Sequence, residues 1–485
     1  MMKINKQSNG TRKQTVLMFP WLGHGHVSPF LELSKSLSNT NLFNTYLCST
    51  SANLDSVKKT LTNASVRLIE LSLPTLPDLP PHLHTTNGLP LHLMPTLKQA
   101  FDLAIPQFSR ILIDLKPDLL IYDIIQPWAP VAASALGIPS VVFITTSAAA
   151  SMYHQYLNTT KKGVVFPFSS TIFYRTYEDG HESKRPTVHP KEKDRVMECV
   201  GKSSSIVLVK TFEEIEGKYA DYLSFLTNKK IVPVGPLVAD PTDVDMKQNA
   251  VIQWLDSKAI GLTVFVSFGS EYFLSSVDMK EIAYGLEMSN VNFIWVLRFP
   301  KGEDSKTKAS EALPLGFAER VENRGLIVDG WAPQAKILGH KNIGGFVSHC
   351  GWSSVLEAMK FGVPIIAMPM QLDQPINARL AVEVGVGVEV VREENGHLKR
   401  ETVAEVVKHV VVSKLGEAVR EKAKKLGADL KLKGDKEMDV AADELLHLCK
   451  SGSGNNLRVG SGSGLRKTKS DAFPIGAHCA LKGEV

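Results

Sequence analysis

Cysteine is scarce in this chain of 485 residues, with five scattered at positions 48, 199, 350, 449 and 479. The count is odd and no two of them form a CxxC pair, so no disulfide framework is indicated. We therefore expect free thiols and a reduced, cytoplasmic compartment. Cys350 has two interpretations, a catalytic thiol or a small buried residue behind a strand end, and its residue type favours the second.

The chain also lacks a convincing signal peptide or membrane span. The early run TVLMFPWLG is short and contains Pro20, which favours a first β-strand. Residues 131–152 are uncharged and long enough to cross a bilayer, but GIPS interrupts them and Ser, Thr and Ala dominate the second half. We expect a helix, a turn, a strand and a helix of an α/β core there, without stable membrane insertion.

The body of the chain has no net positive charge, although the whole sequence carries +5. Residues 1–13 carry +4 and residues 451–485 carry +3, which leaves −2 for residues 14–450. A basic groove for nucleic acid is therefore not indicated. The apolar content of 44% and the charged content of 22% are typical of a globular protein, and the length predicts two large domains or more.

Short apolar runs alternate with helical spacing along both halves of the chain. The first half holds the strand candidates QTVLMFP, NTYLCST, VRLIELSLP, PDLLIYDII, PSVVFIT, SSIVLVKTF and KKIVPVGPL. The second half restarts the alternation with TVFVSFGS, NFIWVLRF and GLIVDGWAP. This order predicts an α/β fold with two Rossmann-like, doubly wound parallel sheets.

The composition also divides the chain into segments. We expect a disordered N-terminus (1–13), a first domain (14–238), a polar linker (239–250), a second domain (251–450) and a flexible Gly/Ser-rich tail (451–485). The Pro- and His-rich stretch PTLPDLPPHLHTTNGLP reads as a surface loop, and residues 153–202 show no clear period. We interpret the latter as an insertion on the substrate side of the first domain.

The stretch from Trp331 to Gln374 is organised around an anion site. IGGFVSHCG predicts a buried strand closed by a glycine turn, and SSVLEAMKFG predicts a helix with Ser353 or Ser354 as N-cap and Glu357 in the first turn. Free backbone N–H groups and the positive end of the helix dipole point outward together at such a junction. Glu357 and Asp373 add acceptors for hydroxyl groups, so the stretch indicates a nucleotide-sugar site.

The same stretch resembles, without a gap, the signature box of plant UDP-dependent glycosyltransferases. The resemblance implies the GT-B architecture, with the last helices crossing back to the first domain. Position 353 departs from the pattern, because the family usually has Asn where this chain has Ser. A serine hydroxyl can still donate to phosphate, although it is shorter.

The resemblance also implies a role for each matching residue of the box. Trp331 would stack on uracil, and Gln334 and Glu357 would bind the ribose. The remaining implied donor-site residues are His349, Ser353 and Ser354 for the diphosphate, Trp352, Asp373 and Gln374 for the sugar, Ser270 after the strand VSFGS for the diphosphate, and Ala332 beside Trp331.

The segment GHGH places His24 and His26 after the first strand, at the sheet edge where ligands bind. In the family pattern G-H-x-x-P, His26 matches the catalytic base, whereas the position of His24 usually carries Gln. Asp123 ends the strand PDLLIYD and matches the carboxylate that hydrogen-bonds this histidine. Such a pair orients the imidazole and stabilises its charged form.

The words FVSFGSEYFLS and EIAYGLEMSNVNFIWVLRFP carry a narrower resemblance, to the subgroup that adds a sugar to a sugar already on a plant metabolite. We expect an inverting, monomeric enzyme that uses UDP-glucose on a flavonoid, lignan or terpenoid glycoside and requires no metal. UDP-xylose, -galactose, -rhamnose or -glucuronic acid, and a direct aglycone acceptor, stay open as alternatives.

Two other classes of function are weaker. A non-catalytic nucleotide-sugar-binding protein would need no base, which the pair His26 and Asp123 argues against. The alternative of a hydride-transferring Rossmann enzyme is supported only by GVG at 385–387. This segment has no third glycine and does not open the first βα turn. The segment DVD at 243–245 imitates a metal-binding DxD, but it lies in the polar linker and reads as a solvated turn.

Overall fold

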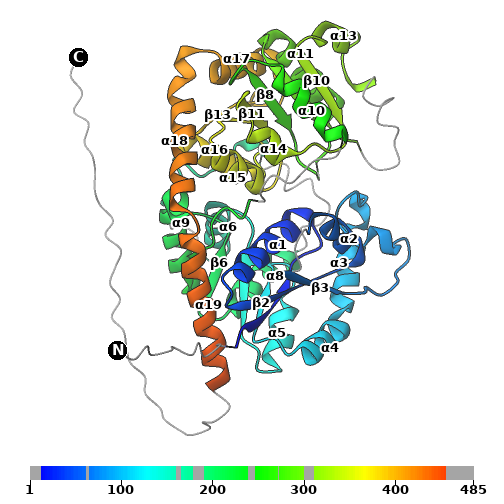
Figure 1. The fold of residues 1–485 in the computed structure, drawn as a ribbon, viewed down its shortest axis with the longest axis vertical. Helices are drawn as coiled ribbons and strands as arrows, with labels where there is room; N and C mark the ends of the chain where they lie inside the picture. Colours follow the sequence, from blue (N-terminus) through cyan, green and yellow to red (C-terminus); the bar gives the residue numbers. More distant parts are fainter. Residues whose placement is uncertain are drawn as a thin grey trace, which may run out of the picture.

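The computed structural model describes residues 12–61, 65–159, 165–178, 190–238, 246–270, 272–299 and 311–454. These residues form two α/β domains that lie one above the other, with the first domain in blue to green at the bottom of Figure 1 and the second in green to orange at the top. Each domain is built on one parallel sheet, so the predicted α/β fold class is confirmed.

The first domain is built on a sheet of seven parallel strands in the order β3-β2-β1-β4-β5-β6-β7. The strands are β1 (Gln14–Phe19), β2 (Phe43–Ser49), β3 (Val66–Glu70), β4 (Leu119–Tyr122), β5 (Ser140–Ile144), β6 (Ile206–Val209) and β7 (Lys230–Pro233). The helices are α1 (His24–Asn39), α2 (Ser51–Thr60), α3 (Met94–Leu103), α4 (Ile105–Leu115), α5 (Trp128–Ser134), α6 (Ala148–Thr159), α8 (Pro190–Lys202) and α9 (Glu213–Thr227), with 3₁₀ turns η1 (Pro81–Leu83) and η2 (Leu91–Leu93).

The second domain is built on six parallel strands in the order β10-β9-β8-β11-β12-β13. The strands are β8 (Thr263–Ser267), β9 (Asn292–Leu297), β10 (Gly325–Asp329), β11 (Ile343–Ser348), β12 (Ile365–Ala367) and β13 (Gly387–Glu389). The helices are α10 (Met246–Asp256), α11 (Ser276–Ser289), α13 (Phe317–Val321), α14 (Gln334–Leu338), α15 (Trp352–Phe361), α16 (Gln374–Val384), α17 (Arg400–Val411), α18 (Glu417–Lys433) and α19 (Lys436–Gly454), with the 3₁₀ turn η3 (Lys414–Gly416).

The central strands β4, β5, β8 and β11 are buried along their whole length, which explains why they are largely apolar. In β1, Leu17 and Phe19 belong to the core shared with α3, α4 and α5, whereas Val16 and Met18 pack with α1 and α19. Phe19 stacks on Phe108 with ring centroids 4.1 Å apart. The alternation of a strand thus assigns its side chains to two separate cores.

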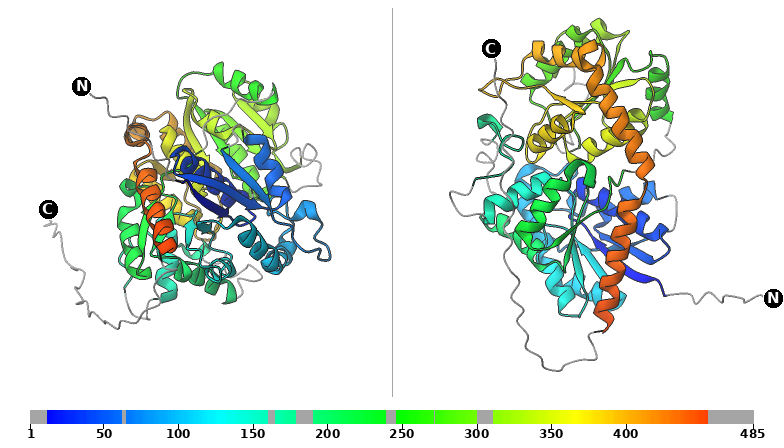
Figure 2. Two further views of the ribbon diagram at one scale, coloured as in Figure 1. Left: turned by 60° about the horizontal axis from the view of Figure 1, so that its bottom comes forward. Right: turned by 90° about the vertical axis from the view of Figure 1, so that its left-hand side faces the viewer.

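The last two helices connect the domains. In Figures 1 and 2, α18 runs along the second domain and α19 continues down the side of the first. Helix α19 packs against β7, β4 and α1, and Glu444 accepts from Lys230 at 2.6 Å. Buried Ala441 and Leu445 join the core of the first domain, so the last described helix of the chain packs on the domain that contains its first strand.

Several segments differ from their predictions. Arg12 and Lys13, expected to be disordered, contact Asp118 and Asn41. The patternless region 153–202 contains most of α6 and all of α8, whereas 160–164 and 179–189 lie outside the described residues. Helix α10 occupies the second half of the predicted linker, and α19 extends four residues into the predicted tail.

The remaining differences concern loops and the tail. In the predicted surface loop, His84, Thr85 and Thr86 are buried, because Thr86 N–H donates to the carbonyl of Leu22 at 3.1 Å. The DVD segment and residues 455–485 lie outside the described part of the chain. Within that part, no helix combines the length and hydropathy needed to cross a membrane.

Candidate active site

His26 and Asp123 meet at the carboxyl edge of the first sheet. The neighbouring strands β1 and β4 pair Phe19 with Tyr122, so the residues that follow them lie side by side. His26 Nδ1 lies 2.8 Å from Asp123 Oδ2. His26 stands in the first turn of α1, which starts at His24, five residues before Pro29.

The carboxylate of Asp123 is fully buried and held by the backbone. Its Oδ2 also accepts from the N–H of Trp21 at 3.0 Å, and its Oδ1 accepts from the N–H of Ile124 at 2.7 Å. An ionised carboxylate can only accept, so Nδ1 of His26 must carry the proton that it donates. The lone pair then resides on Nε2 of a ring whose side chain is 25% exposed, which is the arrangement of a general base.

The turn between β11 and α15 builds the anion site of the second domain. Helix α15 begins at Trp352 with Gly351 as N-cap and no side-chain cap, so the predicted serine N-cap is wrong and Glu357 lies in the second turn. Cys350, at φ 64°, is fully buried, and burial raises the pKa of its thiol. The interpretation as a small buried residue therefore holds over that of a catalytic thiol.

His349 is held between two glycines. A Cβ built on Gly269 or on Gly351 would lie 2.6 Å from His349 Nε2. Burial lowers the pKa of His349 to about 4, so its imidazole is neutral near pH 7 and offers one N–H donor. Ser270, directly after Gly269, follows β8 at the same sheet edge.

The residues predicted for the ribose form one hydrogen-bonded group. Gln334 Nε2 donates to Glu357 Oε2 at 2.7 Å and to Ser354 Oγ at 3.2 Å. Burial raises the pKa of Glu357. Trp331, three residues before Gln334 in the chain, exposes 61% of its surface, and Ala332 is buried. An exposed indole and a buried acceptor suit a flat base and a diol.

The three residues predicted for the sugar are arranged differently from one another. Trp352 is 4% exposed, and its Nε1 donates to the carbonyl of Lys210 in the first domain at 2.6 Å. Its indole therefore joins the second domain to the first, and the sugar contact that the resemblance implies for Trp352 stays a prediction. Asp373 accepts from Asn377 Nδ2 at 3.0 Å, and burial raises the pKa of its carboxyl group.

Gln374 was expected both to donate to and to accept from the sugar. Its Oε1 already accepts from the N–H groups of Met370 at 3.0 Å and Gln371 at 2.9 Å. The amide NH₂ is consequently the end of this side chain that can serve a ligand. The oxygen instead fixes the loop that precedes α16.

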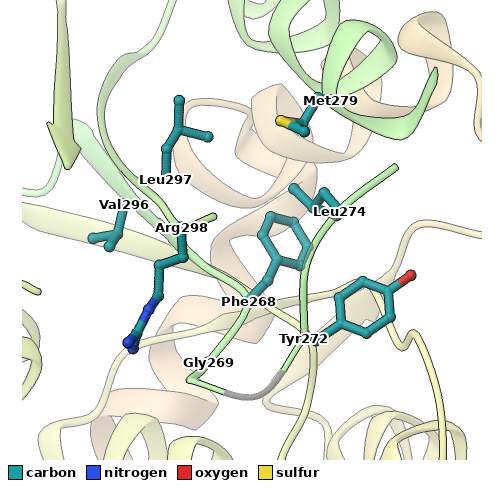
Figure 3. Close-up of a pocket in the computed structure, with 8 residues that line it drawn as sticks. All are labelled: Phe268, Gly269, Tyr272, Leu274, Met279, Val296, Leu297 and Arg298. Carbon is teal, nitrogen blue, oxygen red and sulfur yellow. The ribbon is translucent and has the colours of Figure 1, made fainter. Parts of the chain in front are cut away.

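A narrow pocket opens beside Gly269, between the carboxyl ends of β8 and β9 (Figure 3). Phe268, Leu274 and Met279 gather on one side, whereas the side chain of Arg298 extends away from them. This pocket adjoins the diphosphate candidates through Gly269. No group of three or more described His, Cys, Asp or Glu residues is arranged to hold a metal ion.

Sequence reasoning missed Lys210, which directly follows β6 and donates from Nζ to Ser353 Oγ at 2.8 Å. It also missed Asn377, whose Oδ1 accepts from Ser147 Oγ of the first domain at 2.6 Å. Both contacts bring the carboxyl edges of the two sheets face to face. The sequence contained a signal for this lysine, because a charged residue directly follows the apolar run IVLV.

The GVG segment that suggested a hydride-transferring enzyme has another explanation. Gly385, at φ 81°, is the C-cap of α16, and Gly387 opens β13. These glycines therefore lie between a helix and the strand that follows it, not between a strand and a following helix. The dinucleotide fingerprint is absent from this place.

Comparison with known proteins identifies the class that this fold and site define. The family model for "UDP-glucoronosyl and UDP-glucosyl transferase" matches residues 226–426, and the model for "Glycosyltransferase, N-terminal domain" matches residues 13–239. The molecule is thus a UDP-dependent glycosyltransferase of GT-B architecture. More narrowly, the chain belongs to the plant family-1 UDP-glycosyltransferases, as its relatives show.

One relative is UDP-glucosyltransferase 29 of Panax ginseng, 51% identical over 91% of this chain and 98% of its own length. Another is the β-D-glucosyl crocetin β-1,6-glucosyltransferase of Gardenia jasminoides, 48% identical over 89% and 98%. Among solved structures, Glycyrrhiza uralensis UGT73P12, complexed with glycyrrhetinic acid 3-O-monoglucuronide, aligns with a TM-score of 0.79 at 25% identity, over 91% of this chain and 96% of that one.

Proposed function

We propose that the protein transfers glucose from UDP-glucose to a hydroxyl of a sugar already attached to a plant metabolite, such as a flavonoid, lignan or terpenoid glycoside, with inversion. The observation that carries the proposal is the His26–Asp123 pair, at 2.8 Å, on a sheet edge that faces the N-terminus of α15. The names of the relatives from Panax and Gardenia support glucose as the sugar, and the Gardenia name supports a glucosylated acceptor.

In the proposed reaction, His26 Nε2 takes the proton of the acceptor hydroxyl as its oxygen attacks the anomeric carbon. The bond between that carbon and the diphosphate oxygen breaks on the opposite face, and UDP leaves with the bonding electrons. Asp123 keeps Nδ1–H in place and stabilises the imidazolium that forms. General-base assistance of this kind contributes about 10²–10⁴ in rate.

The leaving diphosphate is stabilised by the second domain in this proposal, without a metal ion. The N–H groups of the first turn of α15 and the hydroxyls of Ser353 and Ser354 belong to the start of this helix, and the imidazole of His349 lies beside its N-cap Gly351. Ser270 adds a donor from the β8 loop. Gln334 and Glu357 hold the ribose, Trp331 the uracil, and Asp373 and the NH₂ group of Gln374 the glucose.

The test is a competition among equal concentrations of UDP-glucose, UDP-xylose, UDP-galactose, UDP-rhamnose and UDP-glucuronic acid, with panels of glycosides and their aglycones. A hexose added to glycosides is expected by mass spectrometry, and a dominant pentose, deoxyhexose or uronic acid product would refute the glucose assignment. His26→Ala should abolish transfer and leave UDP binding intact. A rate above about a tenth of wild type would show that His26 is not the base.

Compartment and assembly belong to the same proposal. We place the enzyme in the cytoplasm as a monomer, and the described cysteines Cys48, Cys199, Cys350 and Cys449, all buried free thiols, support a reducing compartment. Fractionation of cells and light scattering of the purified protein test both statements.

A further inference from the structure

Lys210 is a buried cation at the place where the two domains meet. It is 2% exposed and is the only lysine buried among the residues that the structure describes. Its N–H donates to the carbonyl of Ile144 at 3.0 Å, and its own carbonyl accepts from Trp352 Nε1 at 2.6 Å. The main chain of this lysine is therefore held by both domains, and its side chain is directed to α15.

The ammonium group of Lys210 has a neutral partner. Nζ donates to Ser353 Oγ at 2.8 Å, and no carboxylate within the described part of the chain forms an ion pair with it. The charged groups that face it at longer range are Glu357 of α15 and Glu32 of α1, and Glu32 is itself paired with Lys35 at 2.8 Å. A buried charge without a counter-ion is costly, so the site is prepared for an anion.

The hydroxyl of Ser353 can transmit this charge. A serine hydroxyl has one proton to donate and two lone pairs to accept with. Because Lys210 donates to the oxygen, the proton of Ser353 is directed to another acceptor. Ser353 is the second residue of α15, whose first N–H groups lack partners within the helix, so an anion there meets several donors together.

We propose that Lys210 is a positioning residue for the diphosphate of the donor: it holds and polarises the Ser353 hydroxyl and supplies, from the first domain, the positive charge that offsets the bound diphosphate. This inference rests on the donor site of the proposed function. It also implies that donor binding strengthens the contact between the domains, because the cation and the anion site lie on different domains.

Lys210→Met tests the proposal, with Lys218→Met as the matched control. Lys218 also reaches from the first domain to the second, where it pairs with Glu383 of α16. Isothermal titration with UDP should show affinity reduced by about tenfold or more in Lys210→Met, as for a lost charge-assisted contact, and unchanged in Lys218→Met. Uridine, which lacks the diphosphate, should bind equally to all three proteins.

Thermal unfolding separates positioning from a structural role. Removing an unpaired buried cation should leave the melting temperature without ligand unchanged or raised, whereas the stabilisation by saturating UDP should shrink. A lower melting temperature without ligand, together with unchanged UDP affinity, would show that Lys210 only stabilises the fold and would overturn the proposal.

Two further measurements address the mechanism. The loss of UDP affinity in the double variant Lys210→Met/Ser353→Ala should be smaller than the sum of the two single losses, and additive losses would contradict transmission through the hydroxyl. Burial lowers the pKa of Lys210 to about 8, so wild-type affinity for UDP should fall as pH rises above that value, relative to the variant. The protonation of UDP itself changes with pH in the same way in both experiments. If the affinities of wild type and Lys210→Met followed the same pH dependence, the role of Lys210 would be refuted.

These outcomes are distinguishable from failure of the proposed function. If wild-type protein neither binds UDP nor transfers sugar, the donor site itself is wrong. If it does both and Lys210→Met behaves like wild type, only the role of Lys210 falls.

Discussion

Asp123→Asn is the most informative single change in the proposed base. Three donors converge on the two oxygens of this buried carboxylate: the N–H of Trp21 and Nδ1 of His26 on Oδ2, and the N–H of Ile124 on Oδ1. Asparagine keeps one oxygen and replaces the other with an NH₂ group, which cannot accept. In either orientation of the amide, the new NH₂ group therefore faces an N–H donor at the position of one of the two original oxygens.

Each orientation has its own consequence. If the NH₂ group takes the place of Oδ2, it donates to Nδ1, and Nε2 of His26 then carries the proton and cannot act as a base. If it takes the place of Oδ1, it opposes the N–H of Ile124, and the imidazolium still loses its counter-charge. A buried donor left unsatisfied costs about 1–3 kcal/mol, so we expect unfolding free energy to fall by that amount.

The rate should fall by about 10²–10⁴, the contribution of general-base assistance. UDP release measured at saturating substrates gives the rate. Titration with UDP should show unchanged affinity, because the hydrogen bonds of Asp123 come from Trp21, Ile124 and His26, none of which is proposed to bind UDP. The double variant with His26→Ala should be no slower than His26→Ala alone. A variant that keeps more than about a tenth of the wild-type rate, or whose effects add to those of His26→Ala, would refute the dyad.

Three other predictions test packing and charge elsewhere. Gly269→Ala should weaken UDP binding, because its Cβ would lie 2.6 Å from His349 Nε2, whereas Gly261→Ala, also at positive φ but with open space around it, should only destabilise the fold by about 1–2 kcal/mol. Burial raises the pKa of Glu216 to about 7, so the folded state binds its proton more tightly than the unfolded state. The associated stability is complete below about pH 4.5 and is lost as pH rises through 7. Relative to Glu216→Gln, the wild-type unfolding free energy should therefore decline by up to about 3 kcal/mol between pH 4.5 and 8, and a constant difference in chemical denaturation would contradict it. Gln374→Ala should lower kcat/KM for UDP-glucose by about tenfold or more, as for a lost buried hydrogen bond, and change UDP affinity much less; an equal loss of both would place Gln374 outside the sugar site.

The parts of the fold that followed from sequence are those in which local pattern and burial agree. Parallel strands covered on both faces must be short, apolar and β-branched, so IVLV and TVFVS were recognisable without any partner. Their carboxyl ends were equally recognisable, since a glycine turn or a polar residue follows each of them. That logic placed His26 and Asp123 on one edge before their contact was known.

The N-cap of α15 shows where local rules fail. Serine is a better N-cap than most residues, which favoured Ser353 or Ser354. The backbone turn decides instead: Cys350 adopts φ 64°, and the helix starts immediately after Gly351. An earlier start leaves both serine hydroxyls free of capping, so the error concealed a feature on which the proposed donor site depends.

Contacts between the domains could not be predicted because they join residues far apart in sequence. Trp352 and Lys210 are separated by 142 positions, and no local sequence pattern predicts their hydrogen bond. Similarly, Arg379 pairs with Glu178 at 2.7 Å, although Glu178 lies in a region without clear pattern. Only the three-dimensional arrangement shows that the indole of Trp352 is used by the first domain.

The division of the site has a mechanistic consequence. The proposed base His26 and its partner Asp123 both belong to the first domain, and the Gln334–Glu357 group belongs to the second. Each half would therefore keep its own geometry if the domains shifted. Reaction, however, needs the base and the anomeric carbon in register, and a misplacement of about 1 Å can cost 10²-fold in rate. The polar contacts that join the domains, such as that of Lys210, should thus control turnover more strongly than they control the stability of either domain.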